Sequence, residues 1–202
     1  MHKISFRWLT MSATSNSKYP AMDLGDFTVR PIREEDVHNY FLLIESNRER
    51  IAKYFSNVTA ANKDIESTAA FVVERLSLLE KEELISFVIC DNLTQKVIGS
   101  IFLKNIDRKV QKAELSFFID KNYEGKGIIT KVVSLIIKYC FQHLLFNKIF
   151  LRIAEDNISS RRVAEKNGFV LEGTLRHDFK TPEGQFIDIV YYGLLNDLPR
   201  AF

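Results

Sequence analysis

A glycine-containing loop between a strand-like segment and an amphipathic helix constrains the fold of this chain most. The loop covers residues 123–130 (YEGKGIIT) and follows the strand-like residues 112–119. A turn that enters a helix directs the free N–H groups of the first helical turn, and the positive end of the helix dipole, toward one point, which suits a phosphate group. Gly125 and Gly127 tolerate positive φ and allow close backbone approach, and Lys126 adds positive charge. The loop therefore predicts a binding site for a pyrophosphate.

The spacing of the loop does not match the common nucleotide-binding motifs. A Walker loop places four residues between its first glycine and a Gly-Lys-Ser/Thr run, and the residues before Lys126 supply no such glycine. A Rossmann fingerprint needs a third glycine where this chain has Thr130. A GxG motif by itself is weak evidence, so the loop has an alternative interpretation as an ordinary solvated turn that precedes a helix.

The composition is that of a soluble globular protein and argues against a dedicated nucleic-acid binder. The chain has 202 residues, and its 28 Lys and Arg nearly balance 26 Asp and Glu, for a formal net charge of +2. A nucleic-acid binder would carry a strongly basic face. No apolar run approaches the ~20 residues that a membrane helix needs. We therefore expect a cytoplasmic protein without direct nucleic-acid or membrane partners.

The cysteines and histidines predict neither a disulfide nor a metal site. Cys90 and Cys140 lie far apart without a CxxC partner, so we expect them to be buried small hydrophobic residues in a reducing compartment. The four histidines show no metal-ligand spacing. We therefore expect the protein to function without a metal.

Hydrophobic periodicity and turn signals predict a mixed α/β order of elements. Residues 1–26 are expected to be a loosely ordered extension, and residues 27–202 a single domain. The helix after the glycine loop carries a long apolar stripe, which we interpret as core. The predicted strands are 27–31, 85–90, 97–103, 112–119, 148–154, 169–175 and 186–194, and the other predicted helices are 34–46, 64–81 and 159–167. This order is typical of a mixed sheet covered by helices.

Two segments together resemble the GNAT acyl-CoA N-acyltransferase superfamily. They are the strand and loop over residues 113–130 and the later stretch 156–169 (DNISSRRVAEKNGF). Within that superfamily the chain is similar to the RimJ/RimL branch of ribosomal-protein N-terminal acetyltransferases, over about residues 27–195. The resemblance implies the GNAT fold, an α/β arrangement in which a mixed, mostly antiparallel sheet splays between two central parallel strands and is flanked by helices.

The resemblance also implies acetyl-CoA as the co-substrate. The strand backbone would hydrogen-bond the pantetheine arm where the two parallel strands separate, and the loop amides would hold the pyrophosphate. Asn157 matches a family position that touches the cofactor arm, although asparagine also suits a helix entry. Glu124 departs from the arginine or glutamine of many members, and its charge must point away from the phosphates or weaken binding. The implied cofactor-binding residues are Phe117, Phe118, Ile119, Glu124, Gly125, Lys126, Gly127, Ile128, Ile129, Thr130 and Asn157.

A candidate general acid, Ser160, follows from the same resemblance. Ser160 matches the residue of this branch that is proposed to protonate the departing CoA thiolate, and a hydroxyl placed over the thioester sulfur suits that task. The alternative is a serine in the first helical turn that assists the cap. We expect the neighbouring Ser159 to be the N-cap itself.

The general base stays open between several candidates. An α-amino group is roughly a tenth neutral at pH 7, whereas a lysine side chain is less than about 0.1% neutral, so a base matters more for lysine. Glu114 shares one face of its strand with Ser116 and Phe118, because side chains alternate along a strand. Its alternative role is a structural carboxylate paired across the sheet. His177, Asp178 and water are the other candidate bases.

We therefore expect an N-acetyltransferase that transfers acetyl directly to an α-amino group of a ribosomal protein or another peptide. A small-molecule amine acetyltransferase (for a polyamine, amino acid or antibiotic) and a non-catalytic acyl-CoA-binding module are the alternatives. The acceptor would lie between residues 47–62 and the final hairpin, and a cluster in residues 47–62 either lines a groove or forms a solvated helix end. That cluster is Arg48, Arg50, Lys53 and Tyr54. The protein is expected to be a monomer or a homodimer, since a terminal hairpin offers exposed strand edges.

Overall fold

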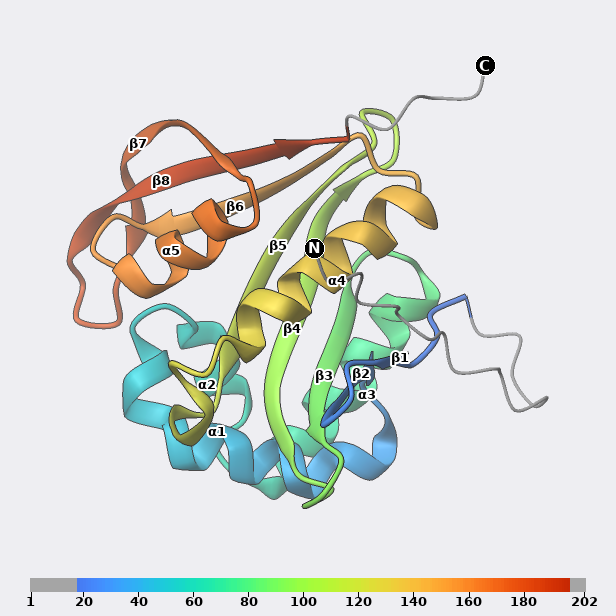
Figure 1. The fold of residues 1–202 in the computed structure, drawn as a ribbon. Coiled ribbons are helices and arrows are strands. Elements are labelled where there is room, and N and C mark those ends of the chain that lie inside the picture. The colour runs from blue at the N-terminus through green and yellow to red at the C-terminus, as the bar shows by residue number, and fades with distance from the viewer. Residues whose placement is uncertain (1–17, 197–202) are drawn as a thin grey trace.

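The computed structural model describes residues 18–196, which form an eight-stranded sheet with helices on both faces (Figure 1). The strands lie in the order β1-β2-β3-β4-β5-β6-β8-β7, and all described neighbours pair antiparallel except β5 and β6. The strands are β1 (Met22–Asp23), β2 (Phe27–Pro31), β3 (Ile85–Asp91), β4 (Val97–Asp107), β5 (Lys112–Ile119), β6 (Lys148–Ala154), β7 (Val170–Lys180) and β8 (Phe186–Leu195). The helices are η1 (Glu34–Asp36), α1 (Val37–Ala52), α2 (Ser56–Ala61), α3 (Ile65–Glu80), η2 (Lys121–Tyr123), α4 (Ile128–Gln142) and α5 (Ile158–Lys166).

The sheet separates two apolar clusters, because successive side chains of a strand point to opposite faces. On one face, Leu115 and Phe117 of β5 belong to a cluster with the apolar stripe of α4. On the other face, Phe118 belongs to a cluster with α1 and α3, where the rings of Tyr40 and Phe71 stack 5.5 Å apart. The predicted interpretation of the α4 stripe as core is confirmed. These two layers fix the glycine loop at the end of β5, directly before α4.

The central strands β5 and β6 separate part-way along their length. Their parallel register ends at the pair Glu114 and Phe150, although β5 continues to Ile119 and β6 to Ala154. Beyond that pair, the facing backbone edges of the two strands do not pair with each other, and the strands diverge (Figure 1). This confirms the predicted sheet that splays between two central parallel strands.

Most predicted elements are confirmed, with changes at their ends. The helix expected at 34–46 starts with the η1 turn and continues as α1 to residue 52, and β4 continues to residue 107. The short elements β1 and α2 were not predicted. The loosely ordered extension expected over residues 1–26 is wrong for its last part, because β1 pairs with β2 and both Tyr19 and Met22 are buried in the core. Residues 1–17 of that expected extension lie outside the described residues.

Within residues 18–196, no helix is long and apolar enough to cross a membrane. No three His, Cys, Asp or Glu side chains of that region gather into a group that could hold a metal ion. Cys140 is buried as predicted, Cys90 is half-buried, and both thiols are free.

Candidate active site

The gap between β5 and β6 lies next to two cavities that meet. The larger cavity, of about 700 Å³, extends from the glycine loop to the first turns of α5, and the smaller, of about 150 Å³, lies over β5 and β6. Both cavities are lined by the same five residues at their junction, which are Tyr54, Phe55, Phe117, Asn157 and Ser160. Two compartments joined in this way suit two substrates that react at the point where they meet.

The glycine loop bounds the larger cavity, and its backbone requires glycine at two positions. Gly125 and Gly127 have φ of 71° and 72°. This left-handed region costs residues with a side chain about 1–2 kcal/mol. A Cβ atom at either position would meet nothing within 4 Å, so the backbone conformation rather than crowding is the constraint. Gly127 is the N-cap of α4 and offers no capping side chain, which leaves the N–H groups of the first helical turn available to an anion.

Ten of the eleven residues expected to bind the cofactor line the larger cavity. They are Phe117, Phe118, Ile119, Glu124, Gly125, Gly127, Ile128, Ile129, Thr130 and Asn157. The eleventh, Lys126, is not among the lining residues, and its ammonium lies 5.1 Å from the centre of the Tyr123 ring. A residue that lines the cavity does not for that reason contact the cofactor, so the cofactor-binding roles of all eleven residues stay predictions.

An ion pair neutralises Glu124, the residue whose charge is unfavourable near a phosphate site. Arg50 of α1 donates from Nη1 to the Glu124 carboxylate at 2.6 Å. Its Nη2 donates to Asn47 Oδ1 at 2.9 Å and also to the carbonyl oxygen of Ile119. The guanidinium therefore connects α1 both to the end of β5 and to the glycine loop. Arg50 itself lines the larger cavity, so it contributes positive charge there.

The first turn of α5 presents Asn157 and Ser160 at the junction. Asn157 is the N-cap, and its Oδ1 accepts from the N–H of Ser160 at 3.2 Å and from the hydroxyl of Ser159 at 3.0 Å. The expectation that Ser159 is the N-cap is therefore wrong, because the helix begins at Ile158. Among residues 18–196, Ser160 Oγ has no recorded hydrogen-bond partner. The half-buried Ser160 hydroxyl thus remains able to donate a proton at the junction.

Tyr54 and Phe55 close the junction from the segment between α1 and α2. The Tyr54 hydroxyl donates to Asp156 Oδ1 at 3.2 Å, and Lys53 forms an ion pair with the same carboxylate. The hydrogen bond from Lys53 holds the pKa of Asp156 below its ordinary value. The ring of Phe55 packs against Phe118 with ring centres 5.2 Å apart. Residues 53–55 are therefore fixed between the sheet and the start of α5.

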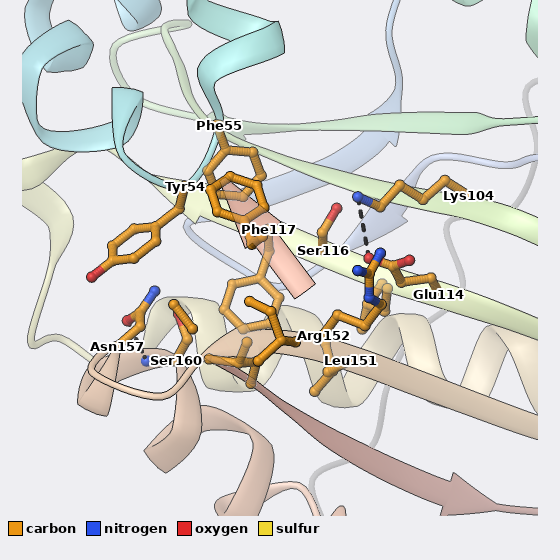
Figure 2. A pocket seen from close by; sticks show the side chains of 15 residues that line it. Tyr54, Phe55, Lys104, Glu114, Ser116, Phe117, Leu151, Arg152, Asn157 and Ser160 are labelled. Atoms are coloured by element: carbon orange, nitrogen blue, oxygen red, sulfur yellow. Dashed lines mark hydrogen bonds and ion pairs between the residues drawn. The ribbon is translucent and has the colours of Figure 1, made fainter. Parts of the chain in front are cut away.

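Glu114 lies at the opposite end of the smaller cavity from Ser160 and is paired across the sheet (Figure 2). The residue is 2% exposed, its Oε1 lies 3.2 Å from Lys104 Nζ, and its Oε2 accepts a 2.6 Å hydrogen bond from Asn105. Asn105 takes a φ of 49° where the register between β4 and β5 shifts. These contacts match the structural alternative for Glu114. The carboxylate also lines the cavity and has about four acceptor positions, so its role as a base stays a prediction.

The other two candidate bases do not line either cavity. A register shift in the middle of β7 bulges the strand, and the N–H of His177 donates there to Asp188 Oδ1 at 2.9 Å. Asp178 forms an ion pair with Arg152 of β6. Arg152, unlike His177 and Asp178, lines the smaller cavity.

A model of the acetyltransferase (GNAT) domain matches residues 26–170, well over half of the chain. The chain belongs to the GNAT acetyltransferase family. The predicted superfamily is thereby confirmed, and the protein is an N-acetyltransferase. GNAT acetyltransferases use acetyl-CoA, which agrees with a strand, a glycine loop and a helix start that together border a large cavity.

Several similar proteins are named as ribosomal-protein acetyltransferases. A Bacillus subtilis protein, YdaF, provisionally named a ribosomal N-acetyltransferase, is 31% identical over 169 residues, which are 83% of this chain and 90% of that protein. The ribosomal-protein-S5-alanine acetyltransferase of Vibrio fischeri superimposes with a TM-score of 0.84 at 22% identity, over 90% of this GNAT chain and 100% of that one. RimL, a ribosomal L7/L12 α-N-protein acetyltransferase solved with CoA, gives a TM-score of 0.81 at 17% identity, over 89% and 100% of the two chains. At these identities the two structures show a shared fold.

The side chains of the smaller cavity that were not singled out from the sequence of this GNAT protein include one aromatic ring and two cations. These three are Phe55, Lys104 and Arg152. Arg152 lies on a predicted strand, but Lys104 lies just beyond the predicted strand 97–103, and the face shared with Glu114 depends on the register between strands. In the structure Lys104 is the direct partner of Glu114 across β4 and β5.

Proposed function

We propose that this enzyme acetylates an α-amino group at the N-terminus of a ribosomal protein or another peptide. The observation that carries the proposal is the junction of the two cavities at Ser160 and Asn157. The junction supports one compartment for acetyl-CoA and a second for the amine. A cavity of about 150 Å³ suits an acceptor that inserts only its end, and the names of the relatives support a protein N-terminus.

Acetyl-CoA would occupy the larger cavity. The N–H groups at the start of α4 suit its pyrophosphate, and the unpaired edge of β5 at residues 117–119 suits the amides of the pantetheine arm. The side-chain amide of Asn157 would donate to the same arm, since its oxygen is already used as the cap of α5. These residues would place the thioester where the cavities meet.

In the proposed reaction, the amine nitrogen attacks the thioester carbonyl carbon, the carbon–sulfur bond breaks, and CoA leaves as a thiolate. Ser160 gives its hydroxyl proton to the sulfur. The attacking amine must lose a proton, which Glu114 accepts through water and then releases to solvent, and solvent returns a proton to Ser160. About a tenth of an α-amine is neutral at pH 7, so a weakly placed base is sufficient for this acceptor.

Ligand-dependent thermal unfolding followed by a thiol-release assay tests this proposal. We expect acetyl-CoA and CoA, but not ATP or NAD, to raise the Tm, because a ligand at about 100 times its Kd stabilises the native state by about 2.7 kcal/mol. We then expect thiol release with peptides that have a free N-terminus and none with the same peptides blocked by N-acetylation. Release with blocked, lysine-containing peptides alone would contradict the α-amine assignment. A Tm rise without turnover of any amine would favour the non-catalytic alternative.

Replacing Arg50 should weaken acetyl-CoA binding through the charge that it leaves behind. In Arg50→Ala the Glu124 carboxylate loses its ion-pair partner beside the phosphate site, so we expect the Kd for acetyl-CoA to rise by about tenfold, equivalent to ~1.4 kcal/mol. The double variant Arg50→Ala/Glu124→Gln should recover most of the affinity, because the unpaired charge is gone. Isothermal titration at low and high salt measures both effects, and the loss should shrink at high salt. Equal losses in the single and double variants would contradict this account.

A further inference from the structure

The charges that line the smaller cavity do not balance. Two cations, Lys104 of β4 and Arg152 of β6, face the cavity together with one carboxylate, Glu114 of β5. All three lie at the end of the cavity opposite Ser160, on neighbouring strands (Figure 2). Among the lining residues alone, one positive charge is therefore in excess beyond the point at which the acceptor amine would react, and Asp178, which does not line the cavity, pairs with Arg152.

The single carboxylate is already occupied. Both oxygens of Glu114 have partners, an ammonium at 3.2 Å and a side-chain amide at 2.6 Å. Its remaining acceptor capacity is what the proposed reaction needs for the proton of the attacking amine. No further carboxylate among the described residues lines this cavity. A second ammonium group on an acceptor would thus find no unpaired carboxylate among the lining residues that the structure describes.

The two cations, by contrast, have unused donors. The Lys104 ammonium has three donors and one recorded partner within residues 18–196, and 39% of its side chain is exposed. Arg152 uses only Nη2 in its recorded contacts with Asp178, which leaves the other N–H groups of a five-donor guanidinium. The Arg152–Asp178 pair is about one-third exposed on both sides, so exchange of one carboxylate for another costs little.

We propose that the acceptor carries a carboxylate close to the amine that is acetylated, and that Lys104 and Arg152 bind this carboxylate. The inference rests on the proposed function, since it assigns the smaller cavity to the acceptor. A planar guanidinium beside an ammonium suits a carboxylate, because charge-assisted hydrogen bonds to both are stronger than neutral ones. The carboxylate can belong to an acidic side chain near a peptide N-terminus or to a free amino acid. A polyamine is disfavoured by the same charges.

The test compares peptides that differ at one position, together with two free amino acids and a polyamine. The kcat/KM for thiol release is measured with peptides that are identical except for glutamate, glutamine or lysine at the second position, with free glutamate and glutamine, and with spermidine. We expect the glutamate peptide to exceed the glutamine peptide by about 10- to 100-fold, as one charge-assisted hydrogen bond provides. A higher kcat/KM for free glutamate than for the peptide would assign the carboxylate to a free amino acid.

Variants of Arg152 and of its ion-pair partner Asp178 should shift the preference for the glutamate peptide over the glutamine peptide in opposite directions. Arg152→Gln should lower the glutamate-to-glutamine ratio by about tenfold, whereas Asp178→Asn should raise it, because Arg152 loses its competing partner. Arg176→Gln is the matched control, since Arg176 is an exposed arginine of β7, the strand of Asp178, and does not line the cavity, so this variant should keep the wild-type ratio. The acetyl-CoA-induced rise in Tm checks that each variant is folded.

The outcomes separate this inference from the proposed function. Good turnover of α-amines with equal kcat/KM for glutamate, glutamine and lysine peptides would overturn the inference alone. Absence of turnover with every acceptor would contradict the proposed function, and binding of the same peptides to the CoA complex would then decide the inference. Tighter binding of the glutamate peptide would support it, and equal binding would overturn it.

Discussion

Ser160→Ala should lower kcat by about 100-fold or more, the usual contribution of a general acid, with a much smaller effect on the KM for acetyl-CoA. The hydroxyl lies at the junction of the two cavities without a recorded partner in residues 18–196, so its removal disrupts no other contact. The deficit should shrink as the pH rises above the reference thiol pKa of about 8.5, because a thiolate then leaves without a proton. Steady-state rates of thiol release from pH 6 to 10 measure this trend.

Ser159→Ala is the matched control for that experiment. Ser159 is the neighbouring serine in the same helical turn, and its hydroxyl donates to the cap residue Asn157. Its loss should change kcat far less than the loss of Ser160 does. A pH-independent deficit in Ser160→Ala, or equal deficits in both variants, would indicate that Ser160 supports the helix start instead of protonating the sulfur.

Gly127→Val should weaken acetyl-CoA binding by about 10- to 100-fold, the equivalent of one lost hydrogen bond to a charged group. Gly127 has a φ of 72°, and a β-branched residue there would move the N–H groups at the start of α4. Free space around the position means that the effect arises from the backbone and not from a clash. Isothermal titration with acetyl-CoA measures the affinity, and thermal unfolding measures the accompanying loss of stability.

Gly25→Val provides the corresponding control. Gly25 has a φ of 78° and, like Gly127, nothing within 4 Å of an added Cβ, but it does not line either cavity. Both substitutions should lower the Tm of the free protein by similar amounts, because both strain a left-handed residue. Only Gly127→Val should also lower the affinity for acetyl-CoA. Similar affinities in the two variants would exclude the loop amides as phosphate ligands.

The order of elements could be predicted from the sequence because each long element has a clear period. The α4 stripe and the strands on both sides of the glycine loop show 3.6-residue and two-residue periodicities. The short elements β1 and α2 were missed, since two or six residues hold too few side chains to show a period. The extent of α1 was also underestimated, because its last turns carry the polar residues Asn47, Arg48 and Arg50.

The lining of the larger cavity could be predicted more fully than the lining of the smaller cavity. The glycines at 125 and 127 indicate directly a loop whose backbone borders the larger cavity. The lining of the smaller cavity depends on strand register and ion pairing, which are set by distant parts of the chain. Arg50, which lines the larger cavity, could also be read as a solvated residue until its contacts with Glu124 and Ile119 were known. Glu114 likewise required the position of Asn105, which a bulge in β4 determines.

The junction of the two cavities has a consequence for the order of the reaction steps. An acetyl group at this junction can pass directly from sulfur to nitrogen, without a covalent acetyl-enzyme intermediate. Neither Cys90 nor Cys140 lines a cavity, and burial raises the pKa of the Cys140 thiol. We therefore expect intersecting initial-rate lines and no exchange of labelled CoA into acetyl-CoA before an acceptor is added. Such an enzyme keeps its bound acetyl-CoA intact until the acceptor amine is bound as well.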